Sequence, residues 1–176
     1  GTLFSLDLDS LAPQAAAPHS PANAAAITDH DSPQFTVAYI GACTGAKLDD
    51  LRAAAGMLRG RTVASGTRLL VAPASRADQA QAADEGVMAI LESAGATILA
   101  TACGMCAGYG PNRLAADDVC ISSTARNFRG RMGAPGSRVW LASPASVAAA
   151  AVTGRLTDPR EMDPHGTPRN TIGGTS

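Results

Sequence analysis

Three cysteines have the residue type and the spacing to do chemistry in this chain. Cys43 ends an apolar run that begins at Thr36, and Cys103 and Cys106 form a Cys-x-x-Cys motif directly after a second apolar run. If the two runs are neighbouring parallel strands, their carboxyl ends bring the three thiols to one crevice. Three thiolates can hold an iron–sulfur cluster and leave one iron without a protein ligand, and such an iron is a Lewis acid.

The cysteine pattern also fits other chemistries. A Cys-x-x-Cys pair at a helix N-terminus is typical of redox proteins, although this motif runs into Gly-Tyr-Gly-Pro rather than a clear helix. Four thiolates, with Cys120 added, would make a zinc site, but zinc sites usually use two close pairs, and Cys43 and Cys120 are isolated. A lone cysteine is most often a buried core thiol. Because Cys120 lies inside an apolar run, we expect it in the core; the iron–sulfur, zinc and redox interpretations stay open.

A basic loop follows another apolar run. Arg126, Arg129 and Arg131 lie within six residues, next to glycines that allow a close approach of the backbone. Arginines spaced in this way can form a fork-shaped receptor for carboxylates. The competing interpretation is a solvated basic turn. The Ser122-Ser-Thr hydroxyls before the loop either bind a ligand or cluster sulfurs or, as is more common, satisfy backbone groups at the strand end. The position of the loop after a strand end, on the edge expected for the cysteines, favours ligand binding.

Length and composition exclude several classes of protein. A chain of 176 residues suits one domain, and an apolar fraction of 45%, much of it alanine, predicts a closely packed core. Aromatic residues make up 3% and the formal net charge is −1, which argues against partners that are nucleic acids. The apolar runs are far shorter than the ~20 residues that span a membrane, and no secretory leader is visible. Four cysteines in such a chain indicate metal or catalytic use in the cytoplasm.

Short apolar runs alternate with amphipathic stretches through most of the chain. We expect strands at 36–41, 68–72, 97–100, 119–122 and 138–142, and helices at 48–58, 76–94 and 145–152. This alternation predicts an α/β fold with a mostly parallel sheet of about five strands and helices on both faces. Functional groups of such sheets gather at the carboxyl ends of the strands, where the cysteines and the basic loop fall.

Proline-rich segments flank this α/β region. Residues 1–34 are predicted to be an extended N-terminal arm with one short strand at Leu3–Leu8, because the repeated prolines exclude a long helix. Residues 35–156 form the predicted cluster-binding domain, and residues 157–176 form a polar C-terminal tail. The three histidines lie in the arm and the tail, and we assign them no role: His19, His30 and His165.

Three motifs together resemble the aconitase superfamily. They occur in the family's order and at similar spacing: Tyr39-Ile-Gly-Ala-Cys43-Thr44, Cys103-Gly-Met-Cys106-Ala-Gly and Ala125-Arg126-Asn127-Phe128-x-Gly130-Arg131-Met-Gly133. Within the superfamily, the chain is most similar to the cluster-binding third domain of the 3-isopropylmalate dehydratase large subunits. The likeness covers roughly residues 3–160.

The resemblance implies an aconitase domain-3-like fold and a 4Fe–4S cluster held by Cys43, Cys103 and Cys106. It also implies that Arg126 and Arg131 bind the carboxylates of a hydroxy polycarboxylic acid, which a hydro-lyase dehydrates and rehydrates to give an isomer. No residue of this chain matches the family's acid–base residues. Partner chains would therefore supply the missing N-terminal domains of the large subunit and the small swivelling subunit, and the chain alone is expected to be inactive.

Two residues depart from the family pattern beside these motifs. Gly45 stands where the family usually has Asn after Cys-Thr, and Ala125 stands where it usually has Asn before Arg-Asn-Phe. The second change removes a polar contact near the cluster. The two changes suit an alternative, a non-catalytic iron- or redox-sensing or scaffolding module that keeps the fold. A dehydratase that does not rehydrate its product and a zinc-binding domain are further alternatives.

Overall fold

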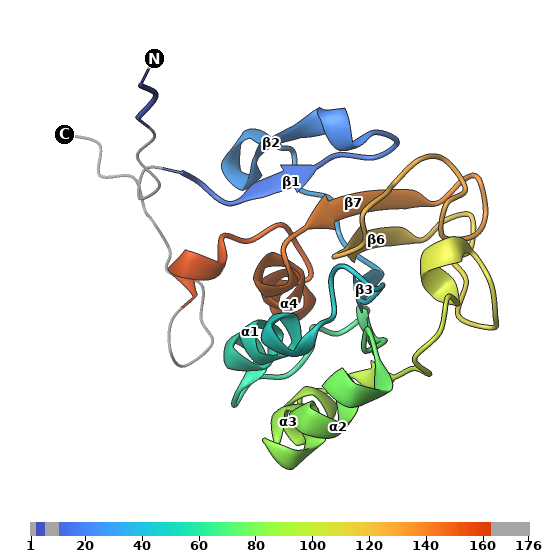
Figure 1. Cartoon of the computed structure of the whole chain (residues 1–176). Helices are drawn as coiled ribbons and strands as arrows, with labels where there is room; N and C mark the ends of the chain where they lie inside the picture. The colour runs from blue at the N-terminus through green and yellow to red at the C-terminus, as the bar shows by residue number, and fades with distance from the viewer. Residues whose placement is uncertain (1–2, 6–10, 163–176) are drawn as a thin grey trace.

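Seven strands form one sheet, in the order β2-β1-β7-β6-β3-β4-β5, in the computed structural model, which describes residues 3–5 and 11–162 (Figure 1). The parallel strands are β3 (Val37–Ile40), β4 (Arg68–Val71), β5 (Thr97–Ile98), β6 (Val119–Ser122) and β7 (Arg138–Ala142). The expected α/β fold with a mostly parallel sheet is confirmed. The sheet has seven strands rather than five because a hairpin near the N-terminus joins it.

This hairpin consists of β1 (Gln14–Ala16) and β2 (Ala24–Ala26), which pair antiparallel, and β1 also pairs with β7. It lies within the segment expected to be an extended arm, so residues 14–26 belong to the sheet. Three-residue strands rich in alanine show no alternation of polar and apolar residues, and the neighbouring prolines fall outside the paired residues. Of the strand expected at Leu3–Leu8, residues 3–5 form no element and residues 6–8 lie outside the described residues.

The structure has four α-helices in its described residues: α1 (Leu48–Leu58) connects β3 to β4, α2 (Arg76–Asp84) and α3 (Val87–Ser93) lie between β4 and β5, and α4 (Pro144–Thr153) follows β7. The single helix expected at 76–94 is two helices, because Gly86 between them has a left-handed backbone with φ of 73°. At the start of α4 the Ser143 hydroxyl accepts a hydrogen bond from the Ser146 N–H, and Gly154 ends the helix in the left-handed conformation.

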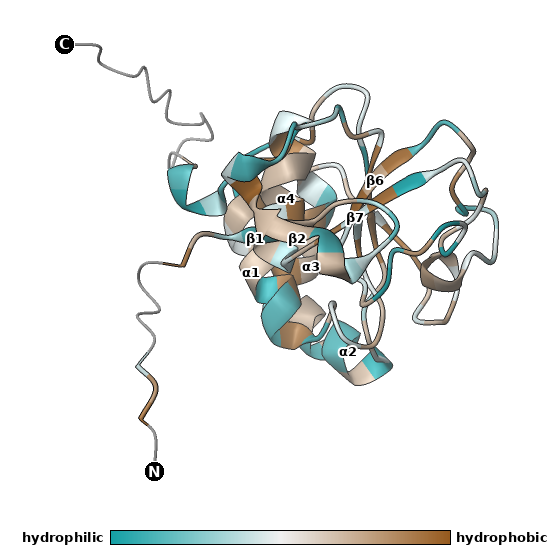
Figure 2. Cartoon of the chain, turned by 90° about the horizontal axis from the view of Figure 1, so that it is seen from above, coloured by the Kyte–Doolittle hydropathy of each residue, from teal (hydrophilic) through white to brown (hydrophobic). Residues whose placement is uncertain are grey.

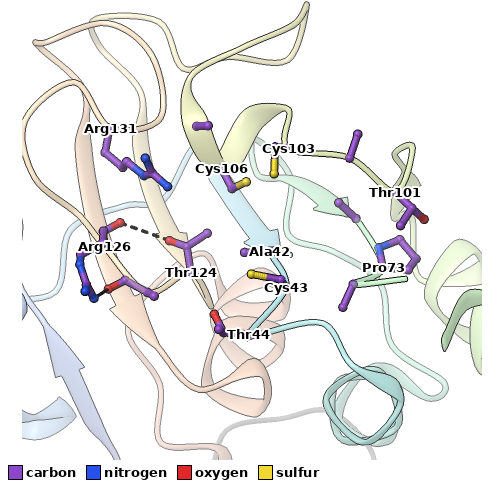
Figure 3. Close-up of a pocket in the computed structure, with 15 residues that line it drawn as sticks. Ala42, Cys43, Thr44, Pro73, Thr101, Cys103, Cys106, Thr124, Arg126 and Arg131 are labelled. Carbon is purple, nitrogen blue, oxygen red and sulfur yellow. Dashed lines mark hydrogen bonds between the residues drawn. The ribbon is translucent and has the colours of Figure 1, made fainter. Parts of the chain in front are cut away.

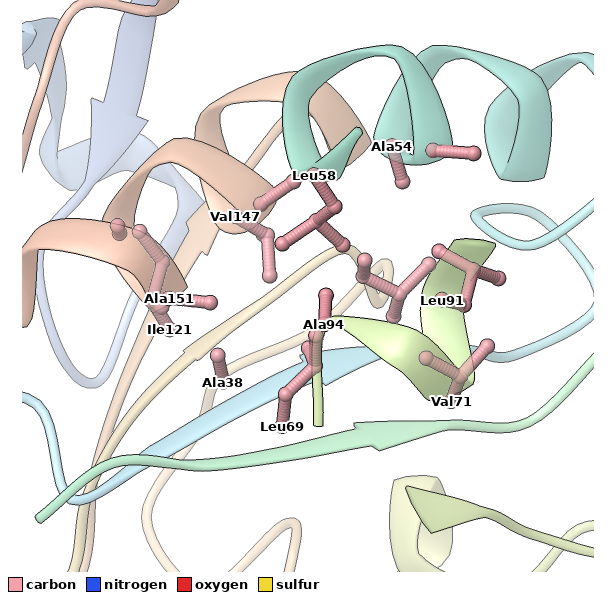
Figure 4. Packing of buried hydrophobic residues seen from close by; sticks show 14 of the residues in the cluster. Ala38, Ala54, Leu58, Leu69, Val71, Leu91, Ala94, Ile121, Val147 and Ala151 are labelled. Atoms are coloured by element: carbon pink, nitrogen blue, oxygen red, sulfur yellow. The ribbon is translucent and has the colours of Figure 1, made fainter. Parts of the chain in front are cut away.

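One face of the sheet is covered by the α-helices, all four of which contribute to a single apolar cluster (Figure 4). Leu51 of α1, Leu91 of α3 and Val147 of α4 are fully buried in it. The sheet contributes side chains from alternate strand positions, such as Ala38 and Ile40 of β3, since successive strand residues point to opposite faces. Helix α2 is peripheral: it buries only Ala82, and most of its surface is hydrophilic (Figure 2).

The opposite face carries no α-helix within residues 11–162. The segments that follow β5 and β6 cover it, and their only helical element on this face is the 3-10 helix η3 (Met105–Ala107). Met105, Leu114 and Met132 pack from these segments against the sheet. The α-helices thus cover one face rather than both, because several left-handed glycines interrupt the connections on the second face: Gly108, Gly110, Gly130 and Gly133. These loops carry the chemistry-bearing residues.

The described end of the chain is the 3-10 helix η4 (Pro159–Glu161). Residues 163–176, which include most of the expected tail and His165, lie outside the described residues. In the part of the chain that the structure describes, no helix has the length and apolar character needed to cross a membrane.

Candidate metal-cluster site

Cys43, Cys103 and Cys106 line one pocket of about 270 Å³ at the carboxyl ends of the parallel strands (Figure 3). Cys43 follows β3, and Cys106 lies in η3 on the segment after β5. The two strands that lead into the cysteines are not neighbours, since β4 lies between them. The segment after β5 returns over the end of β4, where Pro73 also lines the pocket, and so brings the thiols together.

The three thiols have the chemistry of a cluster site. None forms a disulfide; Cys43 and Cys103 are exposed and Cys106 is buried. Burial raises the pKa of the Cys106 thiol, the charge of Cys103 raises it further, and the Arg131 guanidinium opposes them. Cys103 and Arg131 change the pKa of Cys106 in opposite directions because all three side chains face one pocket. Three soft, unpaired donors in one pocket fit an iron–sulfur cluster.

A single-ion site fits this arrangement less well. Among residues 3–5 and 11–162, no three side chains of His, Cys, Asp or Glu lie close enough to share one metal ion. A cluster of several irons is larger than one ion, so each cysteine ligand can reach a different iron. Cys120 is buried within β6, away from the pocket lining, and burial strongly raises the pKa of its thiol. The four-thiolate zinc site that would include Cys120 is therefore not assembled.

Ser123, at the end of β6, holds the turn that carries Cys43. The Gly41 N–H donates to the Ser123 hydroxyl at 3.0 Å, and this hydroxyl donates to the Gly45 carbonyl oxygen at 2.7 Å. A Cβ atom on Gly45 would lie 2.0 Å from the Ser123 carbonyl oxygen. Because the Ser123 backbone, directly after β6, lies this close, no side chain fits at position 45 unless the backbone shifts. Sequence reasoning missed this role of Ser123, because it depends on a contact across 78 residues.

Arg131 points into the pocket on the side of Cys106 (Figure 3). Its guanidinium lies over the Phe128 ring, 5.5 Å from the centroid, and its Nε is buried without a hydrogen-bond partner. A buried donor without a partner is costly unless a ligand accepts from it, and an anion is the strongest acceptor. Arg131 therefore provides a ready contact for a carboxylate.

Arg126 also lines the pocket, but in a different way. It is exposed, and its Nη1 donates to the carbonyl oxygen of the neighbouring Ala125 at 2.8 Å. Arg129 donates to the Pro135 carbonyl oxygen at 3.4 Å and does not line the pocket. The three arginines of the loop thus occupy three environments: the pocket interior, its rim and the outer surface.

Asn127 is a further buried residue of this loop to which the sequence analysis gave no role. Its Nδ2 donates to the Ala17 and Val139 carbonyl oxygens, at 2.9 and 3.2 Å, and it is fully buried. The side chain ties the loop to the β1–β2 hairpin and to β7. In the sequence, Asn127 is a polar residue between Arg126 and Phe128, both of which are exposed. This local pattern gives no indication that the Asn127 side chain is buried.

Comparisons with known proteins identify the family of the chain. A model of the aconitase family (aconitate hydratase) matches residues 29–154. The chain is 45% identical over 157 residues to the "3-isopropylmalate dehydratase large subunit 2" of Archaeoglobus fulgidus, covering 89% of this chain and 38% of that protein. It is 44% identical over 158 residues to the "Homoaconitase large subunit" of Thermus thermophilus, covering 90% of this chain and 38% of that protein.

A similar subunit of Herpetosiphon aurantiacus, "3-isopropylmalate dehydratase large subunit", is 44% identical over 156 residues, which cover 89% of this chain and 37% of the relative. The chain thus spans well under half the length of the curated relatives it matches. Since the family model covers most of the chain and these relatives match nearly all of it, the chain belongs to the aconitase family.

Proposed function

We propose that this chain is the cluster-bearing part of an aconitase-like hydro-lyase that acts on a hydroxy polycarboxylic acid together with partner chains. The observation that carries the proposal is the convergence of three free thiols and the unpartnered Nε of Arg131 on one pocket. The names of the relatives, a dehydratase and a homoaconitase, support the class of reaction.

In this proposal Cys43, Cys103 and Cys106 hold a 4Fe–4S cluster. Such a cluster, when bound, supplies a Lewis-acidic iron with an open position that polarises a substrate hydroxyl. Arg131 binds one substrate carboxylate within the pocket through charge-assisted hydrogen bonds. Arg126, at the rim, binds a second carboxylate by exchanging its contact with the Ala125 carbonyl for a stronger one with an anion.

Dehydration removes a proton from the carbon adjacent to the one that bears the hydroxyl, and this step needs a base. Of the described residues that line the pocket, none is His, Asp or Glu. The matched relatives are named large subunits and are more than twice as long as the matched region. We therefore propose that the base comes from partner chains with the remaining large-subunit domains and a small swivelling subunit, and that the chain alone is inactive. Its free thiols suit a reducing compartment, the cytoplasm.

A second candidate is a non-catalytic iron- or redox-sensing module. Six alanines line the pocket. One of them, Ala125, is the residue at which the resemblance to the family leads us to expect Asn. An apolar lining gives few contacts to the polar groups of a substrate. In this candidate the pocket keeps the three thiols but responds to iron or oxygen without turnover.

Reconstitution with partners separates the two candidates. The chain is loaded with iron and sulfide under anaerobic conditions and mixed with purified chains that carry the missing hydro-lyase domains. A hydro-lyase consumes the hydroxy acid and forms its isomer only in the mixture, and the chain alone shows no turnover. Accumulation of the alkene acid without the isomer indicates a dehydratase that does not rehydrate its product. No consumption by any mixture that binds the loaded chain contradicts the hydro-lyase proposal and favours the sensing module.

A further inference from the structure

Asn127 stands within the loop that carries Arg126 and Arg131. It is fully buried, and its Nδ2 donates to the Ala17 carbonyl oxygen at 2.9 Å and to the Val139 carbonyl oxygen at 3.2 Å. Its Oδ1 is buried without a hydrogen-bond partner. Because an unpaired buried acceptor costs free energy, packing alone does not explain an amide at this position. The two donated hydrogen bonds attach the loop to two separate parts of the sheet.

Contacts on either side of Asn127 connect its position to that of the two arginines. On one side, the Thr124 hydroxyl donates to the Arg126 carbonyl oxygen at 3.3 Å (Figure 3). On the other side, the Arg131 N–H donates to the Phe128 carbonyl oxygen at 3.0 Å, and the Arg131 Cζ lies 5.5 Å from the centroid of the Phe128 ring. Since Phe128 directly follows Asn127, a shift of Asn127 moves the ring against which Arg131 packs.

The other end of this linkage is the tip of the β1–β2 hairpin, residues 17–23. Two contacts of Asn23 close the tip: its carbonyl oxygen accepts from the Ala17 N–H at 3.1 Å, and its Nδ2 donates to the Pro18 carbonyl oxygen at 3.0 Å. Asn23 is exposed, and no residue of the hairpin tip lines the cysteine pocket. Through Ala17 and Asn127, the hairpin tip is therefore connected to a pocket that it does not itself line.

We propose that Asn127 is a positioning residue that, together with the hairpin tip, sets how tightly the pocket binds the substrate carboxylates. The inference rests on the proposed function, in which Arg126 and Arg131 bind these carboxylates. A guanidinium that is already held in place loses less conformational freedom when an anion binds to it. Release of the loop from the hairpin tip should therefore weaken substrate binding and leave the chemical step unchanged.

The first test needs neither cluster nor substrate. The Arg131 Nε is buried, so its proton should exchange slowly with water in the whole ¹⁵N-labelled apo chain, and Arg131→Lys assigns the signal. We expect about tenfold faster exchange in Asn127→Ala and about threefold faster exchange in Asn23→Ala, since the first loses two hydrogen bonds and the second loses one exposed hydrogen bond. Val147→Ala removes buried methyl groups of α4 and controls for a general loss of stability, so it should leave the exchange unchanged.

The second test measures the consequence in the assembled enzyme, with the hydroxy acid that the reconstituted mixture consumes. Asn127→Ala should raise KM about tenfold and Asn23→Ala about threefold, with kcat within about twofold of the wild type, as for a loss of uniform binding. Adding Asn23→Ala to Asn127→Ala should cause no further change, because the linkage is already broken. Asn23→Ala also decides the question if Asn127→Ala does not fold, since the Asn23 side chain is exposed.

The outcomes separate this inference from the proposed function. Faster exchange and a higher KM in both single variants, without additivity in the double variant, support the linkage. An unchanged KM in both, or exchange in Val147→Ala as fast as in Asn127→Ala, overturns the inference and leaves the proposed function standing. An assembly that consumes no hydroxy acid contradicts the proposed function and this inference with it.

Discussion

The two faces of the sheet are built for different tasks. The helix face buries leucines, valines and alanines of four α-helices, and none of the proposed site residues lies on it. The loop face is covered by segments with left-handed glycines and one 3-10 turn, and it carries Cys103, Cys106 and Arg131. Regular packing supplies stability on one face, which allows the other to place functional groups on irregular backbone. The comparison teaches that stability and ligand binding should respond to different substitutions.

The largest effect on stability should come from the helix face. Leu51→Ala removes a fully buried side chain of α1 and leaves a cavity, so we expect a loss of about 2–5 kcal/mol in the free energy of unfolding. The volume-conserving Leu51→Met should cost less than about 1.5 kcal/mol. Urea unfolding measures both, and iron content per folded chain should stay unchanged. Iron loss in folded Leu51→Ala would show that the two faces are coupled.

Arg131→Lys should affect the loop face alone. Lysine keeps the charge but cannot give the bidentate contact, so substrate binding in the assembled enzyme should weaken by about 1.5–2.7 kcal/mol, roughly 10- to 100-fold in KM. The outer-surface variant Arg129→Lys is the matched control, and both variants should retain their iron. Equal KM values for the two variants would remove Arg131 from the substrate site.

Restoring the family's asparagines should have opposite results at the two departing positions. Gly45→Asn forces a Cβ atom onto the Ser123 carbonyl, so we expect about 1–3 kcal/mol of destabilisation and a displaced Cys43 turn that retains less iron. Ala125→Asn, at an exposed position on the pocket rim, should change stability by less than about 0.5 kcal/mol. Thermal unfolding and iron content test the pair, and a Gly45→Asn variant as stable as Ala125→Asn would show that the backbone at Ser123 gives way easily.

Local patterns predicted most of the elements, and long-range contacts account for the misses. The periodicity of apolar residues placed β3, β4, β6, β7 and α1 within about one residue of their observed ends. The hairpin at residues 14–26 was missed because its alanine strands depend on pairing with β7, more than 100 residues away. The break in the expected helix at 76–94 follows from the backbone of Gly86, which a periodic pattern does not reveal.

The candidate site was predicted by residue type rather than by geometry. The cysteines and arginines came from motifs, but the route that joins Cys43 to Cys103 passes over β4, which no spacing indicates. The need for glycine at position 45 arises from a contact with Ser123, which lies far away in the chain. Such contacts depend on the tertiary fold and cannot be found from local sequence.

The most direct test of the central claim is the iron and sulfide content of four cysteine variants after anaerobic reconstitution, beside their visible spectra. Cys43→Ser, Cys103→Ser and Cys106→Ser should each lose the cluster, because a hydroxyl does not replace a thiolate ligand. Cys120→Ser changes a thiol buried in β6 and should keep about four irons and four sulfides per folded chain. Loss of iron in Cys120→Ser alone, or full content in any of the other three, would contradict the account.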